Sequence, residues 1–247
     1  MIYPHFALEL EELTVSFDGF KAVNGVTLYV AKDELRVIIG PNGAGKTTLL
    51  DLICGRTKPT DGKITFMDKV LTRLPEQEIV RAGVVRKFQT PSIYPKISVF
   101  ENLELSHPKG RTAIGAIFFR RTPDVVERIH MVAEQIFLKD LLNKEAEQLS
   151  HGQKQWLEIG MLLMADPQLL LLDEPVAGMS VREREQTAEL LRSICKGRSA
   201  VVIEHDMKFV RRIADKVTVM HQGKVLAEGH MDDIEKDPRV VEVYLGH

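Results

Sequence analysis

The sequence predicts an α/β protein in which helices cover a largely parallel sheet. Three observations predict this class. Apolar runs of strand length alternate with helix-forming stretches after Ser150, as they do in parallel sheets. A glycine-rich segment, residues 40–48, lies between an apolar run and a stretch that should be helical. Another apolar run ends in two adjacent carboxylates, Asp173 and Glu174.

Composition and charge narrow the class of protein. Of the 247 residues, 44% are hydrophobic and 28% are charged, which is the profile of an ordinary globular protein. The formal net charge of −2 creates no overall field that favours nucleic acid, so we expect no nucleic-acid partner. Cys54 and Cys195 have neither metal-binding nor redox spacing. No apolar run approaches the ~20 residues that cross a bilayer, so a membrane role would come through a partner.

The first half of the chain should hold strands, one helix after the glycine-rich segment, and then a helical subdomain. Strands are expected at Leu8–Leu10, Leu13–Phe17, Val26–Val30 and Leu35–Ile39. The first helix should start near Lys46 and end near Cys54, because Gly55 favours termination. The subdomain has an irregular insertion around His107–Arg121, and its expected helices are Glu76–Ala82, Val99–Leu105 and Pro123–Leu138.

Strand and helix alternate after Ser150, which predicts the parallel part of the sheet. Helices are expected at Gly152–Ala165, Arg182–Cys195 and Met207–Ala214. Strands are expected at Leu169–Asp173, Ala200–Glu204, Lys216–Met220 and Val225–Ala227.

Residues 40–48 match the pattern G-x-x-x-x-G-K-[ST] of a phosphate-binding loop. Its glycines let backbone N–H groups face an anion, and the helix that follows presents its positive end to the same phosphates. Lys46 would supply a charge to the β- and γ-phosphates, and the Thr47 hydroxyl is the expected Mg²⁺ ligand. The residues expected to bind the nucleotide here are Gly40, Pro41, Asn42, Gly43, Ala44, Gly45, Lys46, Thr47 and Thr48. The loop alone does not distinguish an ATPase from a GTPase or a kinase.

The two carboxylates after Leu169–Leu172 should have different roles. A buried strand places Asp173 at its C-terminal edge, where ligands bind in open α/β sheets, and Asp173 is expected to hold Mg²⁺ directly or through an intervening ligand. Glu174 points to the other side of the strand, because side chains alternate. That position suits a general base that polarises the attacking water. An acid that caps the next helix is the alternative.

The segment Leu149-Ser150-His151-Gly152-Gln153 precedes an expected helix, and here the chain resembles the ABC ATPases, whose signature is usually Leu-Ser-Gly-Gly-Gln. Ser150 and the N–H groups at Gly152 would cap the helix and leave it able to bind a phosphate. A plain serine cap without a ligand is the alternative. The resemblance implies that Ser150, Gly152 and Gln153 contact the γ-phosphate of ATP held by an opposite subunit. It covers nearly the whole chain, from Leu8 to Gly246.

The resemblance also implies the fold and the remaining site residues. The fold would be that of a P-loop NTPase of the ABC ATPase type: a parallel sheet core, antiparallel N-terminal strands and a helical subdomain. Residues 1–88 and 160–247 would form the catalytic core, and about 89–159 the helical subdomain with the signature. ATP and Mg²⁺ would be the ligands.

Three single residues take their roles from the family's order of motifs. Gln89 would sense Mg²⁺ and the γ-phosphate, and His205, the switch histidine, would join Lys46 and Glu174 in catalysis. Phe17 fits the aromatic residue that stacks on adenine. For His205 and Phe17, a purely structural role is the alternative.

Two positions depart from the family's pattern. His151 replaces the usual first glycine of the signature, at a slot that does not contact the phosphate. Ser180 stands where many ABC proteins carry the aspartate of a loop that communicates between the two ATP sites. The second departure concerns that communication and not hydrolysis itself.

The chain looks like the ATPase of a bacterial importer, with one cassette and no membrane segment. Phe17–Val23, the insertion at His107–Arg121 and the tail Pro238–Gly246 look like the branched-chain amino acid importer group. Four stretches are similar to urea-importer ATPases: Leu35–Ile39, Arg86–Pro91, Leu149–Met164 and Pro175–Met179. Urea is therefore the expected substrate, with branched-chain amino acids or short amides as alternatives. A non-transport ABC ATPase is the alternative of another class, but it would usually carry two cassettes, coiled-coil inserts or basic arms.

The resemblance implies a set of partners. We expect a second ATPase subunit in a head-to-tail dimer, usually a different protein in this group, so that the dimer in the cell is a heterodimer. Two membrane permease subunits and, indirectly, a periplasmic substrate-binding protein complete the importer. The chain would then act at the cytoplasmic face of the inner membrane.

Overall fold

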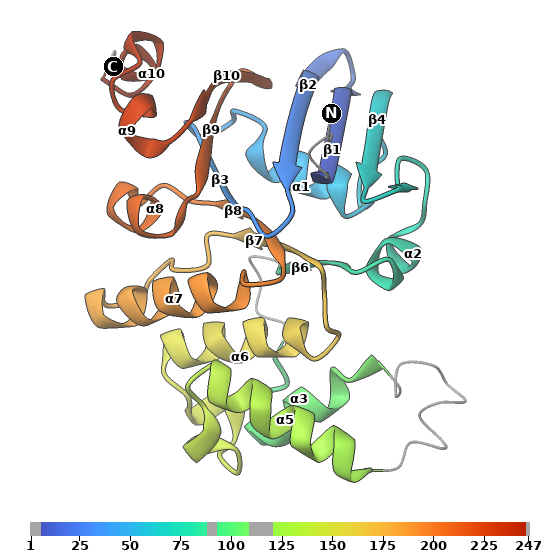
Figure 1. The fold of residues 1–247 in the computed structure, drawn as a ribbon, viewed down its shortest axis with the longest axis vertical. Helices are drawn as coiled ribbons and strands as arrows, with labels where there is room; N and C mark the ends of the chain where they lie inside the picture. Colours follow the sequence, from blue (N-terminus) through green and yellow to red (C-terminus); the bar gives the residue numbers. More distant parts are fainter. Residues whose placement is uncertain (1–5, 88–92, 109–120, 246–247) are drawn as a thin grey trace. The chain divides into compact units, whose positions relative to one another are not determined.

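The computed structural model describes residues 6–87, 93–108 and 121–245 (Figure 1). The chain divides into two compact units. The first holds Met1–Arg86, Gln168–Glu174 and Leu191–His247, and the second holds Lys87–Pro167 and Pro175–Leu190. The predicted boundaries of a catalytic core, residues 1–88 and 160–247, and of a helical subdomain, about 89–159, stay a prediction.

An antiparallel sheet opens the first unit, with strand order β2-β1-β4-β5. Its strands are β1 (Phe6–Phe17), β2 (Phe20–Ala31), β4 (Asp61–Phe66) and β5 (Lys69–Val70). The two short strands expected before Phe17 are one strand, interrupted by a register shift where Glu12 has a positive φ of 48°. The sequence patterns did not predict β4 or β5.

The second sheet of this unit has the order β10-β9-β3-β8-β7-β6. β3 pairs in parallel with β8 and β9, and β8 pairs in parallel with β7, whereas β9 and β10 are antiparallel. The strands are β3 (Leu35–Ile39), β6 (Val84–Lys87), β7 (Leu169–Asp173), β8 (Ser199–Ile203), β9 (Lys216–His221) and β10 (Lys224–Gly229). Every residue of β3, β7 and β8 is buried, as expected for parallel strands covered on both faces.

Arg36 is the exception to the apolar character of β3. Its side chain is fully buried, but its guanidinium lies 2.5 Å from a Glu34 carboxylate oxygen and 2.8 Å from one of Glu228. It also donates to the Thr218 hydroxyl and to the Tyr29 carbonyl. The charge is therefore paired and hydrogen-bonded, which is the condition for burying an arginine.

Helices of the first unit complete its core. They are α1 (Lys46–Ile53), α2 (Glu76–Arg81), α8 (Met207–Ile213), α9 (Met231–Ile234) and α10 (Pro238–Leu245). α1 buries four apolar side chains in a cluster that also includes residues of both sheets. This cluster fixes the helix that follows the phosphate loop.

The second unit is helical. Its helices are α3 (Val99–Leu105), α5 (Pro123–Gln135), α6 (His151–Leu163) and residues 181–190 of α7 (Val181–Ile194), with 3₁₀ turns at Lys139–Leu141 and Ala146–Gln148. Gly160 lets α6 approach its neighbours, because a Cβ there would lie 2.4 Å from Ile136 Cδ1. α5 ends three residues before the predicted Leu138, since Phe137 takes a positive φ of 60°. The insertion at His107–Arg121 falls largely outside the described residues.

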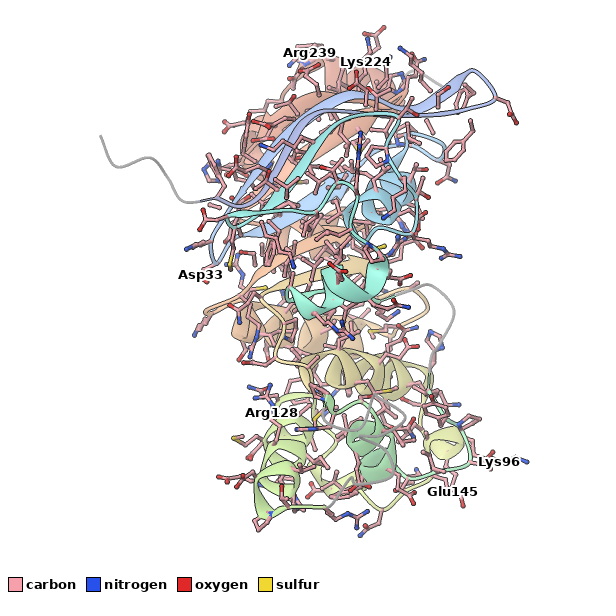
Figure 2. All side chains as sticks on the ribbon, turned by 90° about the vertical axis from the view of Figure 1, so that its right-hand side faces the viewer. Asp33, Lys96, Arg128, Glu145, Lys224 and Arg239 are labelled. Carbon is pink, nitrogen blue, oxygen red and sulfur yellow. The ribbon has the colours of Figure 1, made fainter. Side chains whose placement is uncertain are left out.

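Charges of both signs lie on the surface of each unit. Figure 2 labels Asp33, Lys224 and Arg239 in the first unit, and Lys96 and Glu145 in the second. A mixed surface is consistent with the small formal net charge. Within the described ranges, no helix combines the length and the hydropathy needed to traverse a membrane.

Candidate functional site

The phosphate loop joins β3 to α1, and glycine geometry shapes it. Gly40, Gly43 and Gly45 have positive φ values of 151°, 79° and 99°. A Cβ at Gly40 would lie 2.2 Å from the Met220 carbonyl oxygen, and one at Gly45 would lie 2.4 Å from that of Ala22. Only glycine fits at these two positions, because the loop runs against the backbone of β9 and β2 there.

The first turn of α1 is open to an anion. The helix carries no acidic residue in that turn and no side-chain cap at its N-terminus. Its first N–H groups therefore keep the positive end of the helix available to a phosphate. This is the context that the phosphate-loop pattern requires.

Lys46 lies at the start of α1 with its ammonium over the loop. Its Nζ donates to the carbonyl oxygens of Gly40 at 2.7 Å and Pro41 at 2.9 Å. Burial lowers the pKa of Lys46, while the carboxylates of Glu174 and Asp173 act in the opposite direction. The charge of Lys46 thus lies near both acids of the second motif.

Asp173 is a buried carboxylate at the end of β7, with 1% of its surface exposed. Burial raises its pKa, and the guanidinium of Arg86 and the nearby Thr47 hydroxyl oppose that change. Arg86 Nη2 lies 3.5 Å from Asp173 Oδ2, and Arg86 Nη1 lies 2.6 Å from Asp51 Oδ1. Within the described residues neither oxygen of Asp173 makes a hydrogen bond of good geometry. A carboxylate in that state, beside a hydroxyl, fits Mg²⁺, which takes oxygen ligands and shares them with substrate phosphates.

Glu174 and His205 come together because their strands are neighbours. Asp173 of β7 pairs in register with Ile203 of β8, and the Glu174 N–H donates to the Ile203 carbonyl at 3.0 Å. His205 Nδ1 lies 3.5 Å from Glu174 Oε1, with 67% and 36% of the two side chains exposed. Glu174 has a positive φ of 48°, a conformation that costs a non-glycine residue about 1–3 kcal/mol and concentrates at functional sites.

Phe17 ends β1, and its side chain is exposed. It pairs across the hairpin with Phe20, which is more exposed still. Two exposed aromatic rings at one hairpin could both flank a flat base. Phe20 was not predicted as a site residue, although its spacing from Phe17 is visible in the sequence. Gln89 lies outside the described residues.

The signature segment lies in the second unit, and Ser150 caps α6. Ser150 Oγ accepts from the Gln153 N–H at 3.2 Å, and Gln153 Oε1 accepts from the Ser150 N–H at 2.9 Å. This reciprocal pair is a capping box. It means that the Gln153 side chain also has a role within its own helix.

The two departures from the family's pattern make specific contacts in this unit. The ring nitrogen Nε2 of His151 lies 3.0 Å from the Ala177 carbonyl oxygen. Ser180 precedes α7 and forms a second reciprocal pair, since the Ser180 N–H donates to Glu183 Oε2 at 2.9 Å and the Glu183 N–H donates to Ser180 Oγ at 3.3 Å. Glu183 was not predicted as a site residue, but the spacing Ser-x-x-Glu is the signal of a capping box.

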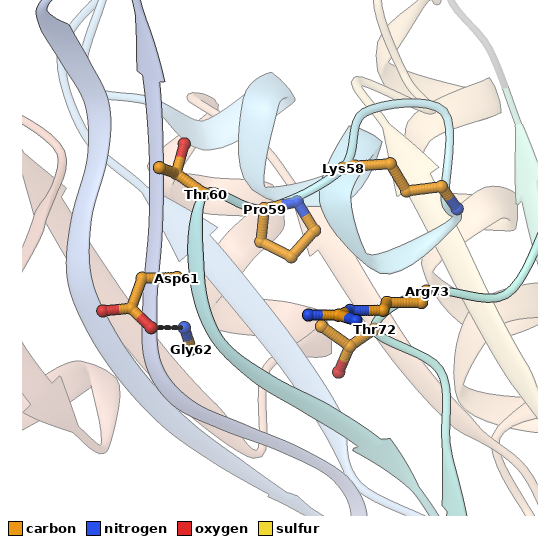
Figure 3. Close-up of a pocket in the computed structure, with 7 residues that line it drawn as sticks. All are labelled: Lys58, Pro59, Thr60, Asp61, Gly62, Thr72 and Arg73. Atoms are coloured by element: carbon orange, nitrogen blue, oxygen red, sulfur yellow. Dashed lines mark hydrogen bonds between the residues drawn. The ribbon is translucent and has the colours of Figure 1, made fainter.

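A cavity of about 300 Å³ lies elsewhere in the first unit, against β4 (Figure 3). Its seven lining residues include Lys58 and Arg73, and the Asp61 carboxylate there accepts from the Gly62 N–H at 2.8 Å. It contains none of the predicted site residues. Of the predicted residues of the first unit, Phe17 lies at the β1–β2 hairpin. The others lie in the phosphate loop and its helix, and at the ends of β7 and β8.

Comparisons with known proteins show the family of the chain. The family model described as ABC transporter matches residues 23–177, and the model described as branched-chain amino acid ATP-binding cassette transporter matches residues 224–247. The chain is 37% identical to the probable branched-chain amino acid transport ATP-binding protein LivG of Archaeoglobus fulgidus, over 97% of this chain and 95% of that protein. It is also 37% identical to the high-affinity branched-chain amino acid transport ATP-binding protein LivG of Escherichia coli strain K12, over 97% of each.

Solved structures share the fold of the chain. The crystal structure of an ABC transporter's ATP-binding cassette in its ADP conformation has a TM-score of 0.87 and 32% identity, over 98% of this chain and 99% of that one. A nucleotide-free cassette has a TM-score of 0.84 and 32% identity, over 98% and 100%. These matches confirm the predicted fold and, with the family model, ATP hydrolysis coupled to transport. The chain belongs to the ABC transporter family, as an ATP-binding ATPase of the group that includes the LivG proteins.

Proposed function

We propose that the chain hydrolyses ATP with Glu174 as general base. Glu174 would accept a proton from water as the water oxygen bonds to the γ-phosphorus. The bond from that phosphorus to the bridging oxygen breaks, and ADP and inorganic phosphate leave. The observation that carries this proposal is the 3.5 Å approach of Glu174 Oε1 and His205 Nδ1, in the unit that holds the phosphate loop. Lys46 and the loop glycines would bind the phosphates.

Thr47 and Asp173, together with Gln89, would hold Mg²⁺. When bound, the ion neutralises charge on the β- and γ-phosphates. The buried carboxylate of Asp173, without a hydrogen bond of good geometry among the described residues, supports this role. Phe17 would stack on adenine, because it offers an exposed aromatic face.

The active form would be a head-to-tail dimer with a second ATPase subunit, a heterodimer in the cell. Ser150, Gly152 and Gln153 of one subunit would contact the γ-phosphate held by the other. The match of residues 149–153 to the family's signature supports this role, although Ser150 and Gln153 also cap α6. The dimer would act on two permease subunits at the cytoplasmic face of the inner membrane and indirectly serve a periplasmic binding protein.

Branched-chain amino acids are the proposed substrate, because the two relatives above are named for their transport. The motif stretches that resemble urea-importer ATPases favour urea as the second candidate. Neither of those relatives carries urea in its name. The ATPase itself does not touch the transported molecule, so uptake must decide between the candidates.

Uptake of labelled leucine and labelled urea tests function and substrate together. Cells would carry the wild-type chain, Glu174→Gln or the control Glu189→Gln, which makes the same charge change on the exposed face of α7. The proposal is supported if leucine uptake is lost in Glu174→Gln and kept in Glu189→Gln. If Glu174→Gln loses urea uptake and keeps leucine uptake, the assignment of branched-chain amino acids as the substrate is overturned. Unchanged uptake of both contradicts the role of Glu174.

A further inference from the structure

Two capped helices of the second unit share one carboxylate, that of Glu183. Its Oε2 accepts from the Ser180 N–H at 2.9 Å and from the Ser180 hydroxyl at 2.8 Å. Its Oε1 accepts from the hydroxyl of the signature residue Ser150 at 3.2 Å. These bonds lower the pKa of Glu183, those from Ser180 most strongly. The N-terminus of α7 and the N-terminus of α6 are thus tied through a single side chain.

Gly152 makes this contact sterically feasible. A Cβ at Gly152 would lie 2.3 Å from Glu183 Oε1 and 2.5 Å from its Cδ. No real Cβ tolerates that approach, so a larger residue would push the carboxylate away from Ser150. Gly152 therefore has an intramolecular reason to be glycine, besides its proposed phosphate contact.

A second contact joins the same two segments. His151 Nε2 lies 3.0 Å from the Ala177 carbonyl oxygen, in the segment Pro175–Ser180 that follows Glu174 in the chain. Gly178, with a φ of +72°, lies close to the imidazole, since a Cβ there would be 3.1 Å from His151 Nε2. His151 and Ser180, the two departures from the family's pattern, both hold this segment to the start of α6.

We propose that Glu183 is a positioning residue that orients the hydroxyl of Ser150 and fixes the segment Pro175–Ser180 to the signature. This inference rests on the proposed contact of Ser150 with ATP. Ser150 Oγ accepts from the Gln153 N–H and donates to Glu183, so its rotamer is set by two partners. Glu183 acts through Ser150 and touches no nucleotide.

The test is a double-mutant cycle on the full transporter, purified through a tag on this chain. Steady-state ATP hydrolysis would be measured for wild type, Ser150→Ala, Glu183→Ala, the double variant and the control Glu189→Gln. We expect Glu183→Ala to lower kcat/KM about 10- to 100-fold, the size that a misplaced contact group produces. In the Ser150→Ala background, the same change should cost less than about 2-fold, because a residue that acts through Ser150 has nothing left to position.

Binding of ATP to the isolated full-length chain separates positioning from misfolding. The phosphate loop supplies that binding, so Glu183→Ala should leave the dissociation constant within about 2-fold of wild type. Equal losses in both Ser150 backgrounds, or an unchanged rate in Glu183→Ala alone, would overturn the inference. A rate that Ser150→Ala leaves unchanged would sink the proposed phosphate contact of Ser150, whatever Glu183 does.

Discussion

Arg86 is the cation that pairs with the buried carboxylate of Asp173 at the end of β7. Its guanidinium lies between two carboxylates, that of Asp51 on α1 and that of Asp173. Only 4% of the Arg86 side chain is exposed. A buried charge of this kind stabilises a fold only while its partners are present. Arg86 therefore connects the helix of the phosphate loop to the acid that would hold Mg²⁺.

Replacing Arg86 by leucine should destabilise the protein by roughly 3–5 kcal/mol, because Asp173 would be left buried without its cation. Arg56→Leu is the matched control, since Arg56 approaches the same Asp51 at 4.0 Å but is 62% exposed. Exposed pairs contribute about 0–1 kcal/mol. Urea unfolding of both variants measures the difference, and equal losses would contradict the proposed role of Arg86.

Asp173→Asn should abolish hydrolysis and yet raise the melting temperature in a chelating buffer at neutral pH. Burial raises the pKa of Asp173, so the folded state binds a proton more readily than the unfolded state. Stability therefore falls as pH rises through the window from the ordinary aspartate value to the raised one, and the cost persists above it. The variant escapes that cost, and Arg86 keeps Asp51 as a partner.

Differential scanning calorimetry checks this prediction. We expect an increase of roughly 2–4 °C at about pH 7.5, the effect of about 1 kcal/mol in a protein of this size. The difference should shrink as the pH is lowered toward the ordinary pKa of aspartate, because wild-type Asp173 gains protons there. A variant that melts below wild type at neutral pH, with Glu189→Gln unchanged, would show that the Asp173 charge is net stabilising.

At the scale of elements, the sequence predicted best the buried strands of five residues, whereas the four-residue strand β6 was missed although it is buried throughout. β3 and β7 have the predicted bounds, because their runs are apolar and end at Gly40 and at the acid pair. β4 and β5 were missed because Asp61–Phe66 opens with polar residues and Lys69–Val70 is too short to form a pattern. These strands exist because β1 pairs with β4 and β4 with β5, and such pairing is not visible in local sequence.

The path of the phosphate loop gives a prediction at this scale. Gly45→Ala and Gly197→Ala both place a Cβ at a positive φ, 99° and 95°, but only at Gly45 does the Cβ meet another group, the Ala22 carbonyl oxygen at 2.4 Å. The strain of that backbone costs about 1–2 kcal/mol at either site. We expect Gly45→Ala to weaken ATP binding at least about 10-fold, and Gly197→Ala to leave it unchanged. Calorimetric titration of ATP measures both, and equal affinities would show that the loop tolerates the methyl group.

At the scale of the whole molecule, short motifs predicted which residues belong to the site. The contacts that hold those residues in place became visible only in the tertiary structure. The phosphate loop, the acid pair and His205 could be named from sequence because each lies in a short pattern. Arg86 could not, and Glu183 could be named only as a helix cap. Their further roles come from contacts between residues 33 and 35 positions apart, Ser150 with Glu183 and Arg86 with Asp51. No local pattern carries a contact over that separation.

Head-to-tail pairing leads to the last prediction. If hydrolysis reopens the dimer, then Glu174→Gln, which keeps the size of the side chain and removes the base, should hold it closed. Light scattering of Glu174→Gln with Mg²⁺ and ATP should give twice the mass of one chain, or a one-to-one complex once the companion ATPase of its importer is added. The double variant Glu174→Gln, Ser150→Ala should be a monomer, because the contact of Ser150 across the interface is lost. A Glu174→Gln chain that stays monomeric alone and with its companion would refute head-to-tail pairing through the signature.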